Sequence, residues 1–128
     1  MYKRQPDIVI TSEDVPIHDR PYTATCVASF VAAVPLDMVT IEWMTVDGAV
    51  LTDVYDRVQV SNIHQINDST FVRDVMVNPL RLEDSGTYIC EAAVMGEFIT
   101  SQAASKTASI TVNGKLTSIS SSVVLMST

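Results

Sequence analysis

Short runs rich in Val, Ile and Thr recur along the chain, and Pro, Gly, Asp and Asn separate them. No 3.6-residue period of apolar positions holds for several turns, so the pattern predicts an all-β fold. The run that begins at residue 39 shows this best, because Val39, Ile41 and Trp43 alternate with Thr40 and Glu42. Alternation with a period of two places one set of side chains in a core and the other in solvent.

Turn and breaker residues divide the chain into about eight or nine strands. Asp47-Gly48 predicts a hairpin turn, since both residues tolerate positive φ. Asn78-Pro79 ends a strand, because proline cannot donate a hydrogen bond to a β-ladder. Within that strand we expect Val75 and Val77 to point inward. The expected strands cover residues 7–12, 22–31, 39–43, 49–51, 57–60, 71–77, 86–94 and 104–112.

The length of 128 residues suits one domain with a single core, expected over residues 7–112. Residues 1–6 would form an N-terminal arm, and the Ser-rich residues 113–128 a linker or the start of a following module. Pro6 and Asp7 interrupt the N-terminus before any signal-peptide-like apolar run, and no stretch reaches the ~18 apolar residues of a membrane helix. We therefore expect a module of a longer protein, reaching a membrane only through a transmembrane segment of that parent.

The formal net charge is −7, and the eight basic residues are scattered along the chain. A phosphate backbone would be repelled by this field, and no polybasic cluster exists to hold an anionic membrane. Nucleic acid is therefore excluded as a partner, and acidity here favours solubility.

Cys26 and Cys90 cannot fill a four-ligand zinc site alone, and His18 and His64 stand at no spacing that suggests shared coordination. Pairing of the two cysteines with each other is the favoured alternative. Such a disulfide persists only in an oxidising compartment and would indicate the secretory pathway.

Cys26, Trp43 and Cys90 fall in three different expected strands, and the run Asp84-Ser85-Gly86-Thr87-Tyr88-Ile89-Cys90 leads into the last. With these residues the chain resembles the immunoglobulin superfamily from residue 7 to residue 112. The resemblance implies a two-sheet Greek-key sandwich of immunoglobulin type, closed by a Cys26–Cys90 disulfide with Trp43 packed against it. It also implies a hydrogen bond from Tyr88 back into the preceding turn, and a tight turn at Gly86.

The resemblance further implies a salt bridge between Arg57 and Asp84 at the base of the sandwich; the alternative is that both are merely exposed. The interval between the cysteines and the extra hairpin at residues 49–55 favour the V-set or I-set over the shorter constant type. The stretch between Cys26 and Trp43 is longer than usual in the family. It either forms an apolar binding tip or extends the second strand and buries Phe30, and we favour burial.

The chain offers few residues that could form a catalytic site. A hydrolytic triad drawn from His64, Asp68 and Ser69 is explained far better by a polar surface hairpin. No glycine-rich phosphate loop follows a strand, and Asp53 with Asp56 lacks the oxygen-rich loop that calcium needs. We expect no enzyme activity, no metal and no cofactor.

Three features of the expected surface are candidates for modification or binding. Asn67-Asp68-Ser69 is an N-glycosylation sequon in the turn before a strand. A candidate binding face is expected on one sheet, with an apolar centre at Met44 and Ile89; the alternative is ordinary isolated apolar exposure. A second candidate surface is the loop end at residues 31–37 and 95–101. The outward positions of the candidate binding face are Thr40, Glu42, Met44, Ile89, Glu91 and Ala93.

The sequence of residues 75–81, together with the motif at residues 84–90, is similar to that of immunoglobulin-like modules of invertebrate surface proteins, such as those of sponges. That resemblance implies an adhesion molecule or the ectodomain of a receptor tyrosine kinase. We therefore expect an extracellular glycoprotein module that binds protein, including a second copy of itself through the candidate face. Two alternatives stay open: a structural spacer in a multidomain ectodomain, and an intracellular I-set module with reduced cysteines.

Overall fold

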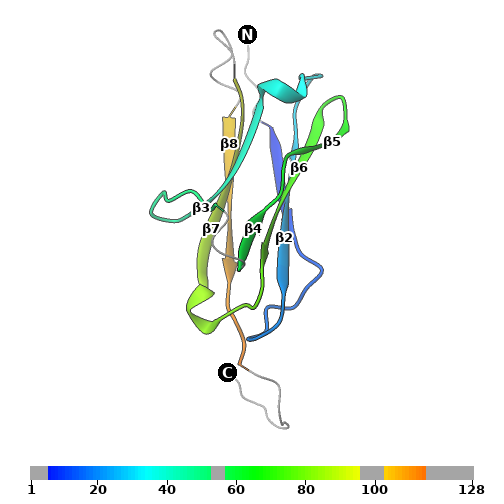
Figure 1. Cartoon of the computed structure of the whole chain (residues 1–128). Coiled ribbons are helices and arrows are strands. Elements are labelled where there is room, and N and C mark those ends of the chain that lie inside the picture. Colours follow the sequence, from blue (N-terminus) through cyan, green and yellow to red (C-terminus); the bar gives the residue numbers. More distant parts are fainter. Residues whose placement is uncertain (1–5, 53–56, 96–102, 115–128) are drawn as a thin grey trace.

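The chain forms two antiparallel sheets packed face to face (Figure 1). The computed structural model describes residues 6–52, 57–95 and 103–114. One sheet has the order β1-β2-β6-β4, and β5 also pairs with β6; the other has the order β3-β7-β8. The strands are β1 (Asp7–Thr11), β2 (Tyr22–Ser29), β3 (Val39–Thr45), β4 (Val58–Val60), β5 (His64–Asn67), β6 (Thr70–Val77), β7 (Gly86–Val94) and β8 (Ala103–Ile110).

Two short 3-10 turns, η1 (Leu36–Met38) and η2 (Leu82–Asp84), complete the described elements. Within the described ranges, no helix is long and apolar enough to cross a membrane. β1 starts at one end of the sandwich and β8 finishes at the other (Figure 1).

Most of the predicted strands are confirmed to within a few residues, and β3 shows why. Val39, Ile41 and Trp43 are buried on its inner face, while Glu42 between them is exposed. An alternating segment can satisfy its backbone in a sheet and still bury one row of side chains. On β6, Val75 is buried and Val77 is half-buried.

The strand predicted at residues 49–51 is wrong. The turn before it forms, with Gly48 at φ 94° and the Gly48 amide donating to the Thr45 carbonyl at 2.9 Å. Beyond the turn the pairing with β3 is limited to a bridge between Met44 and Val50 and two backbone hydrogen bonds, from the Thr45 amide to the Ala49 carbonyl at 2.9 Å and from the Leu51 amide to the Trp43 carbonyl at 2.7 Å. Val50 remains 47% exposed, whereas Leu51 packs partly against the core, and the paired segment is too short to be a strand.

Conversely, β5 is a strand that the pattern did not predict. All four of its residues are exposed, so burial leaves no trace in its sequence. Its antiparallel pairing with β6 holds the segment in a strand conformation, and a register shift between Gln65 and Asn67 makes the strand irregular.

The core lies between the sheets, and its largest fully buried side chains include Trp43, Phe71 and Ile41. Phe30 is 6% exposed and meets Phe71 edge to face, with ring centroids 5.9 Å apart. The expected burial of Phe30 is therefore confirmed. The strand β2 ends at Ser29, and the Phe30 amide continues the same β2–β6 register by donating to the Ser69 carbonyl at 2.7 Å.

A disulfide between Cys26 of β2 and Cys90 of β7 joins the two sheets through the core, with 6.5 Å between the two Cα atoms. Trp43 stands opposite Cys90 in the β3–β7 register. Its indole Nε1 donates to the Arg73 carbonyl on the other sheet at 3.1 Å, so its one polar group is satisfied despite burial.

Arg73 is a second link between the sheets. It stands opposite Cys26 in the β2–β6 register and therefore projects from the inner face of its strand. Its Nε donates to the Ser61 carbonyl and its guanidinium to the Ile41 carbonyl on β3, both at 2.7 Å. The sequence indicates this position of Arg73, because side chains alternate along a strand and Arg73 lies two residues before the inward-pointing Val75.

Removing the disulfide with Cys26→Ala and Cys90→Ala should lower the free energy of unfolding by about 4 kcal/mol, because the bridge closes a long loop in the unfolded chain. Guanidinium-induced unfolding followed by Trp43 fluorescence measures the change. Wild-type protein kept in reductant serves as the matched control and should lose a similar amount. Equal stability of the oxidised and reduced proteins would contradict this account of the bridge.

Candidate functional site on the outer face of the three-stranded sheet

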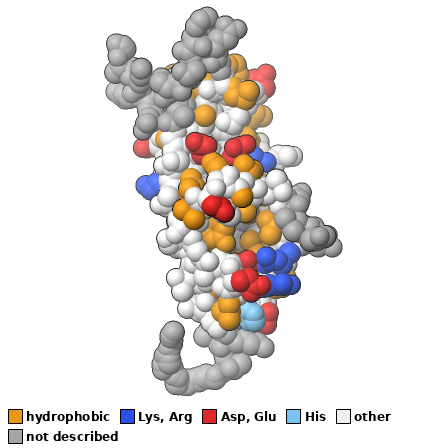
Figure 2. All heavy atoms as spheres, turned by 90° about the vertical axis from the view of Figure 1, so that its left-hand side faces the viewer, with side chains coloured by type: hydrophobic (Ala, Val, Ile, Leu, Met, Phe, Trp, Pro, Cys, Tyr) orange, Lys and Arg blue, Asp and Glu red, His pale blue; other side chains and the backbone are white. Residues whose placement is uncertain are grey.

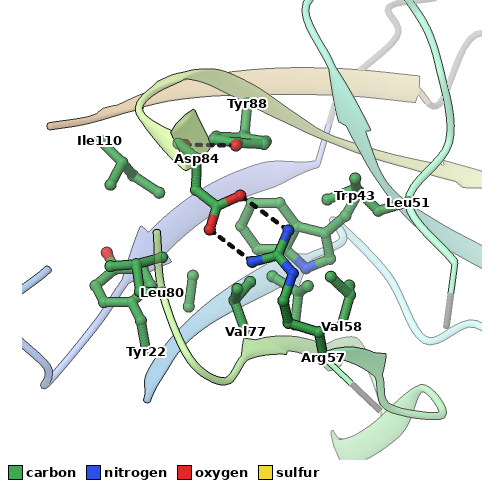
Figure 3. A pocket seen from close by; sticks show the side chains of 12 residues that line it. Tyr22, Trp43, Leu51, Arg57, Val58, Val77, Leu80, Asp84, Tyr88 and Ile110 are labelled. Carbon is green, nitrogen blue, oxygen red and sulfur yellow. Dashed lines mark hydrogen bonds and ion pairs between the residues drawn. The ribbon is translucent and has the colours of Figure 1, made fainter. Parts of the chain in front are cut away.

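The predicted signature residues at the base of the sandwich form a closed structural unit (Figure 3). Arg57 makes two hydrogen bonds to the Asp84 carboxylate, at 2.7 and 3.1 Å, and a third to the Pro79 carbonyl at 3.2 Å. Asp84 also accepts the Arg81 amide at 2.8 Å, and the Tyr88 hydroxyl donates to the Asp84 carbonyl at 2.6 Å. This unit joins the start of β4 to η2 and β7.

The charges of this unit are coupled. Burial acts to raise the pKa of Asp84, but hydrogen bonds from Arg57 and the Arg81 amide outweigh it and hold that pKa below its usual value. The hydrogen bond to Asp84 raises the pKa of Arg57. Burial, with the Asp84 charge, raises the pKa of the Tyr88 hydroxyl, which therefore stays a neutral donor.

The turn into β7 depends on Gly86, whose φ of +154° is rarely adopted by L residues. A Cβ at this position would meet nothing within 4 Å, so the requirement is one of backbone conformation and not of space.

A cavity of about 250 Å³ lies beside the Arg57–Asp84 pair, between the two sheets. Its walls are mostly apolar and include Tyr22, Trp43 and Leu80 (Figure 3). The polar groups at its edge already bond to one another. The described lining therefore offers packing surface and the ion pair, and no nucleophile paired with a base.

The structure brings the six residues of the candidate binding face together. Side chains directly opposite on antiparallel strands project from the same face of a sheet. The β3–β7 register places these residues in three cross-strand pairs: Thr40 with Ala93, Glu42 with Glu91, and Met44 with Ile89. Their face is the one away from Trp43 and Cys90. Figure 2 looks onto this side of the molecule and shows apolar and acidic side chains over its middle.

Exposure differs along this face. Glu42 and Glu91 are exposed, whereas Met44 and Ile89 are half-buried beside them. β8 extends the surface with the small polar side chains of Ser105 and Thr107, which stand opposite Glu91 and Ile89. The result is a broad sheet surface, apolar at one end and acidic in the middle, without a cleft to hold a small substrate.

The other sequence-predicted residues are placed apart from this face. Asn67 is exposed at the end of β5, and its Oδ1 accepts hydrogen bonds from the Ser69 amide at 3.0 Å and the Ser69 hydroxyl at 3.4 Å. His64 begins β5 and Asp68 follows its end. An extended strand separates them at roughly 3.3 Å per residue, so the arrangement drawn as a triad is not assembled.

Metal ligands do not gather in the parts of the chain that the structure describes, where no group of three His, Cys, Asp or Glu could hold an ion. His18 lies 3.5 Å from the Asp19 carboxylate and away from His64. Asp53 and Asp56 lie outside the described residues, as do residues 96–101 of the predicted loop end. Of that second candidate surface, Val31, Leu36 and Met95 are exposed.

Comparison with known proteins places the chain by its fold. The sequence matches no protein-family model and no curated protein. The structure is similar to a chain in the solved structure of the BIgI domain of beta protein from S. agalactiae bound to CEACAM1. That similarity has a TM-score of 0.56 at 17% identity and covers 87% of this chain and 99% of the other. With the two antiparallel sheets, it shows an immunoglobulin-like β-sandwich, as the signature residues predicted.

Asp84→Asn should lower the free energy of unfolding by about 1–2 kcal/mol at neutral pH, because it removes a charge-assisted pair with Arg57. The folded-state pKa of Asp84 lies below its unfolded value, so its contribution is complete above about pH 4. It is lost as the pH falls through the folded value, and the difference between wild type and variant should shrink there. Urea unfolding from pH 7 to pH 2.5 measures this.

Glu83→Gln is the matched control, since Glu83 neighbours Asp84 but lies exposed, 4.0 Å from Arg81. It should change stability little at any pH. A gap between wild type and Asp84→Asn that stays constant across the pH range would show that the carboxylate charge makes no contribution.

Proposed function

We propose that this domain is an extracellular recognition module of a cell-surface receptor or adhesion protein, and that it binds protein through the outer face of β3, β7 and β8. The observation that carries the proposal is the cross-strand alignment of Met44 with Ile89 and of Glu42 with Glu91 on a single exposed sheet face.

The shape and composition of this face suit a protein partner. Small-molecule sites are concave, whereas protein interfaces are broad and combine an apolar centre with polar groups around it. Met44 and Ile89 supply apolar surface at one end of the face, next to Glu42 and Glu91, and Ser105 and Thr107 border it on β8. The side chains rise from paired strands, so little conformational entropy is lost when the surface is covered.

The structural neighbour supports protein binding at the level of the fold. The BIgI domain of beta protein is bound to CEACAM1 in its solved structure. At 17% identity this likeness transfers no partner to the present chain. It supports the view that sandwiches of this kind serve as scaffolds for protein recognition, with the specificity set by the residues that each carries.

The extracellular setting is proposed from two features. A disulfide such as Cys26–Cys90 persists in oxidising compartments. The sequon at Asn67 lies on an exposed turn of the five-stranded sheet, so a glycan there would leave the face of β3, β7 and β8 uncovered.

We extend the proposal to the finer family assignment. The signature residues support a V-set or I-set domain of the invertebrate surface-protein type, with residues 7–112 as the folded unit between an arm and a linker. Backbone hydrogen bonds of Asn113 with Pro16 and His18 carry the described fold one residue further.

A fluorescent tetramer of the domain should stain cells of the source organism, and the double variant Met44→Asp, Ile89→Lys should stain at least tenfold less. The two new charges stand opposite each other in the register, and they replace apolar contact surface with groups that must lose their hydration in the complex. Flow cytometry measures the staining.

Val9→Asp is the matched control, because Val9 is 51% exposed on β1 in the other sheet. It should stain like wild type. Equal staining by all three tetramers would remove the proposed face, and equal thermal melting of the variants excludes misfolding as the cause.

A spacer role is the second candidate, and one observation favours it. The described chain enters the sandwich at β1 at one end and leaves it after β8 at the other (Figure 1), as a module in a linear series would. Under this alternative the wild-type tetramer stains no cells.

Expression through a eukaryotic secretory pathway should yield protein with a glycan at Asn67, because this side chain is exposed in a turn and followed by Ser69. Intact mass before and after peptide N-glycosidase treatment measures occupancy. Ser69→Ala removes the sequon while keeping Asn67 and should show no mass shift. An unmodified wild-type chain would contradict the glycoprotein assignment, and free thiols in it would favour the intracellular alternative.

A further inference from the structure

Two carboxylates of like charge face each other in the middle of the proposed binding face. Glu42 of β3 and Glu91 of β7 are directly opposite in the register, and both are exposed. Opposite side chains in an antiparallel pair have Cβ atoms only about 5 Å apart, and like charges at such positions destabilise a sheet. The isolated domain gains nothing from this pair.

No described basic residue compensates for it on the same face. Lys106 stands opposite Cys90 on β8 and so projects toward the inner side of the sheet. The Arg73 side chain is held by the Ser61 and Ile41 carbonyls, and Arg57 by Asp84. Among the described residues, neither Glu42 nor Glu91 forms an ion pair within 4.0 Å.

Resting on the proposed function, we propose that the partner is a different protein that presents a basic side chain, arginine above all, amid apolar surface. Charge complementarity selects this occupant. Electrostatic potentials across specific interfaces are complementary, and like-charge contacts suppress wrong partners. The like-charge pair is therefore a specificity element of the face.

A guanidinium fits this arrangement for two reasons. It is planar and offers several donors, so it can bond to carboxylates from two neighbouring strands together. Its aliphatic stem can lie along apolar surface, which Met44 and Ile89 provide next to the glutamates. Lysine would supply the charge without the fork of donors.

The same geometry disfavours a second copy of the chain. A two-fold dimer uses the same patch on both subunits. Pairing through this face would bring Glu42 and Glu91 of one copy against those of the other, four carboxylates with no described cation among them. The apolar centre alone would permit self-association, and the glutamates oppose it.

The test uses a charge-reversed copy of the domain as the probe. Glu42→Arg, Glu91→Arg presents two arginines beside Met44 and Ile89. Sedimentation equilibrium is run on wild type, on this variant and on an equimolar mixture. We expect the mixture to associate at least tenfold more tightly than either protein alone, and to weaken in high salt.

Asp7→Arg, Glu13→Arg is the matched control, because both residues are exposed, Asp7 lies in β1 of the other sheet, and Glu13 follows that strand. Each Glu→Arg or Asp→Arg change adds two positive charges, so both double variants carry the same formal net charge. Mixing this control with wild type should give no comparable association.

Three results overturn the inference: wild type that dimerises as tightly alone as with the probe, a mixture that does not associate, or a control that associates equally. The proposed function is judged separately by the cell-staining loss in Met44→Asp, Ile89→Lys. If that loss occurs while a tetramer of Glu42→Arg, Glu91→Arg still stains, the face binds protein but its partner is not selected by a basic group.

Discussion

The fold depends on the buried cluster at the centre of the sandwich, in which Trp43 stands opposite Cys90 and Cys90 is bonded to Cys26. These three residues fix two strands of one sheet and a strand of the other. Because side chains alternate along a strand, holding Trp43 and Cys90 inward also decides that Glu42 and Glu91 point outward. The interior and the proposed binding face are thus set by the same constraint.

The base of the sandwich and the outer face of the three-stranded sheet differ in how their polar groups are satisfied. At the base, Arg57, Asp84 and Tyr88 bond to one another and leave little polar capacity for a ligand. On the outer face of β3, β7 and β8, by contrast, the acidic groups are exposed and form no ion pair with a described cation. A stable scaffold that satisfies its polar groups in one place can carry an unsatisfied arrangement in another, where it serves recognition.

The sequence predicted the parts of the structure in which burial leaves a pattern. The alternation from Val39 to Trp43 and the motif that ends at Cys90 are of this kind, and β3 and β7 lie where they were expected. Residues 49–51 pair with the end of β3 only through a short bridge, and β5 pairs with β6 but has no buried row. Such segments are decided by neighbours distant in sequence, which local propensity does not contain.

The candidate face was only partly predictable for the same reason. Period two indicated which residues lie on the side of each strand away from Trp43 and Cys90, and the register places the six positions in three cross-strand pairs. That Glu42 stands opposite Glu91, and not opposite a neutral neighbour, depends on the register between two strands almost fifty residues apart. Likewise, the position of Arg73 between the sheets follows from its pairing with Cys26.

Arg73 has an effect on assembly. Among the described strands, β3 and β8 border the three-stranded sheet, and residues 49–51 pair with the end of β3 alone. An open strand edge is a template on which further chains can add without limit. The guanidinium of Arg73 covers the Ile41 carbonyl on the edge of β3, and Lys106 projects inward on β8 at the other edge. A basic group at each border resists growth of the sheet by strand addition. This favours contacts with other proteins through the outer face of the sheet, as proposed above, where they depend on side chains.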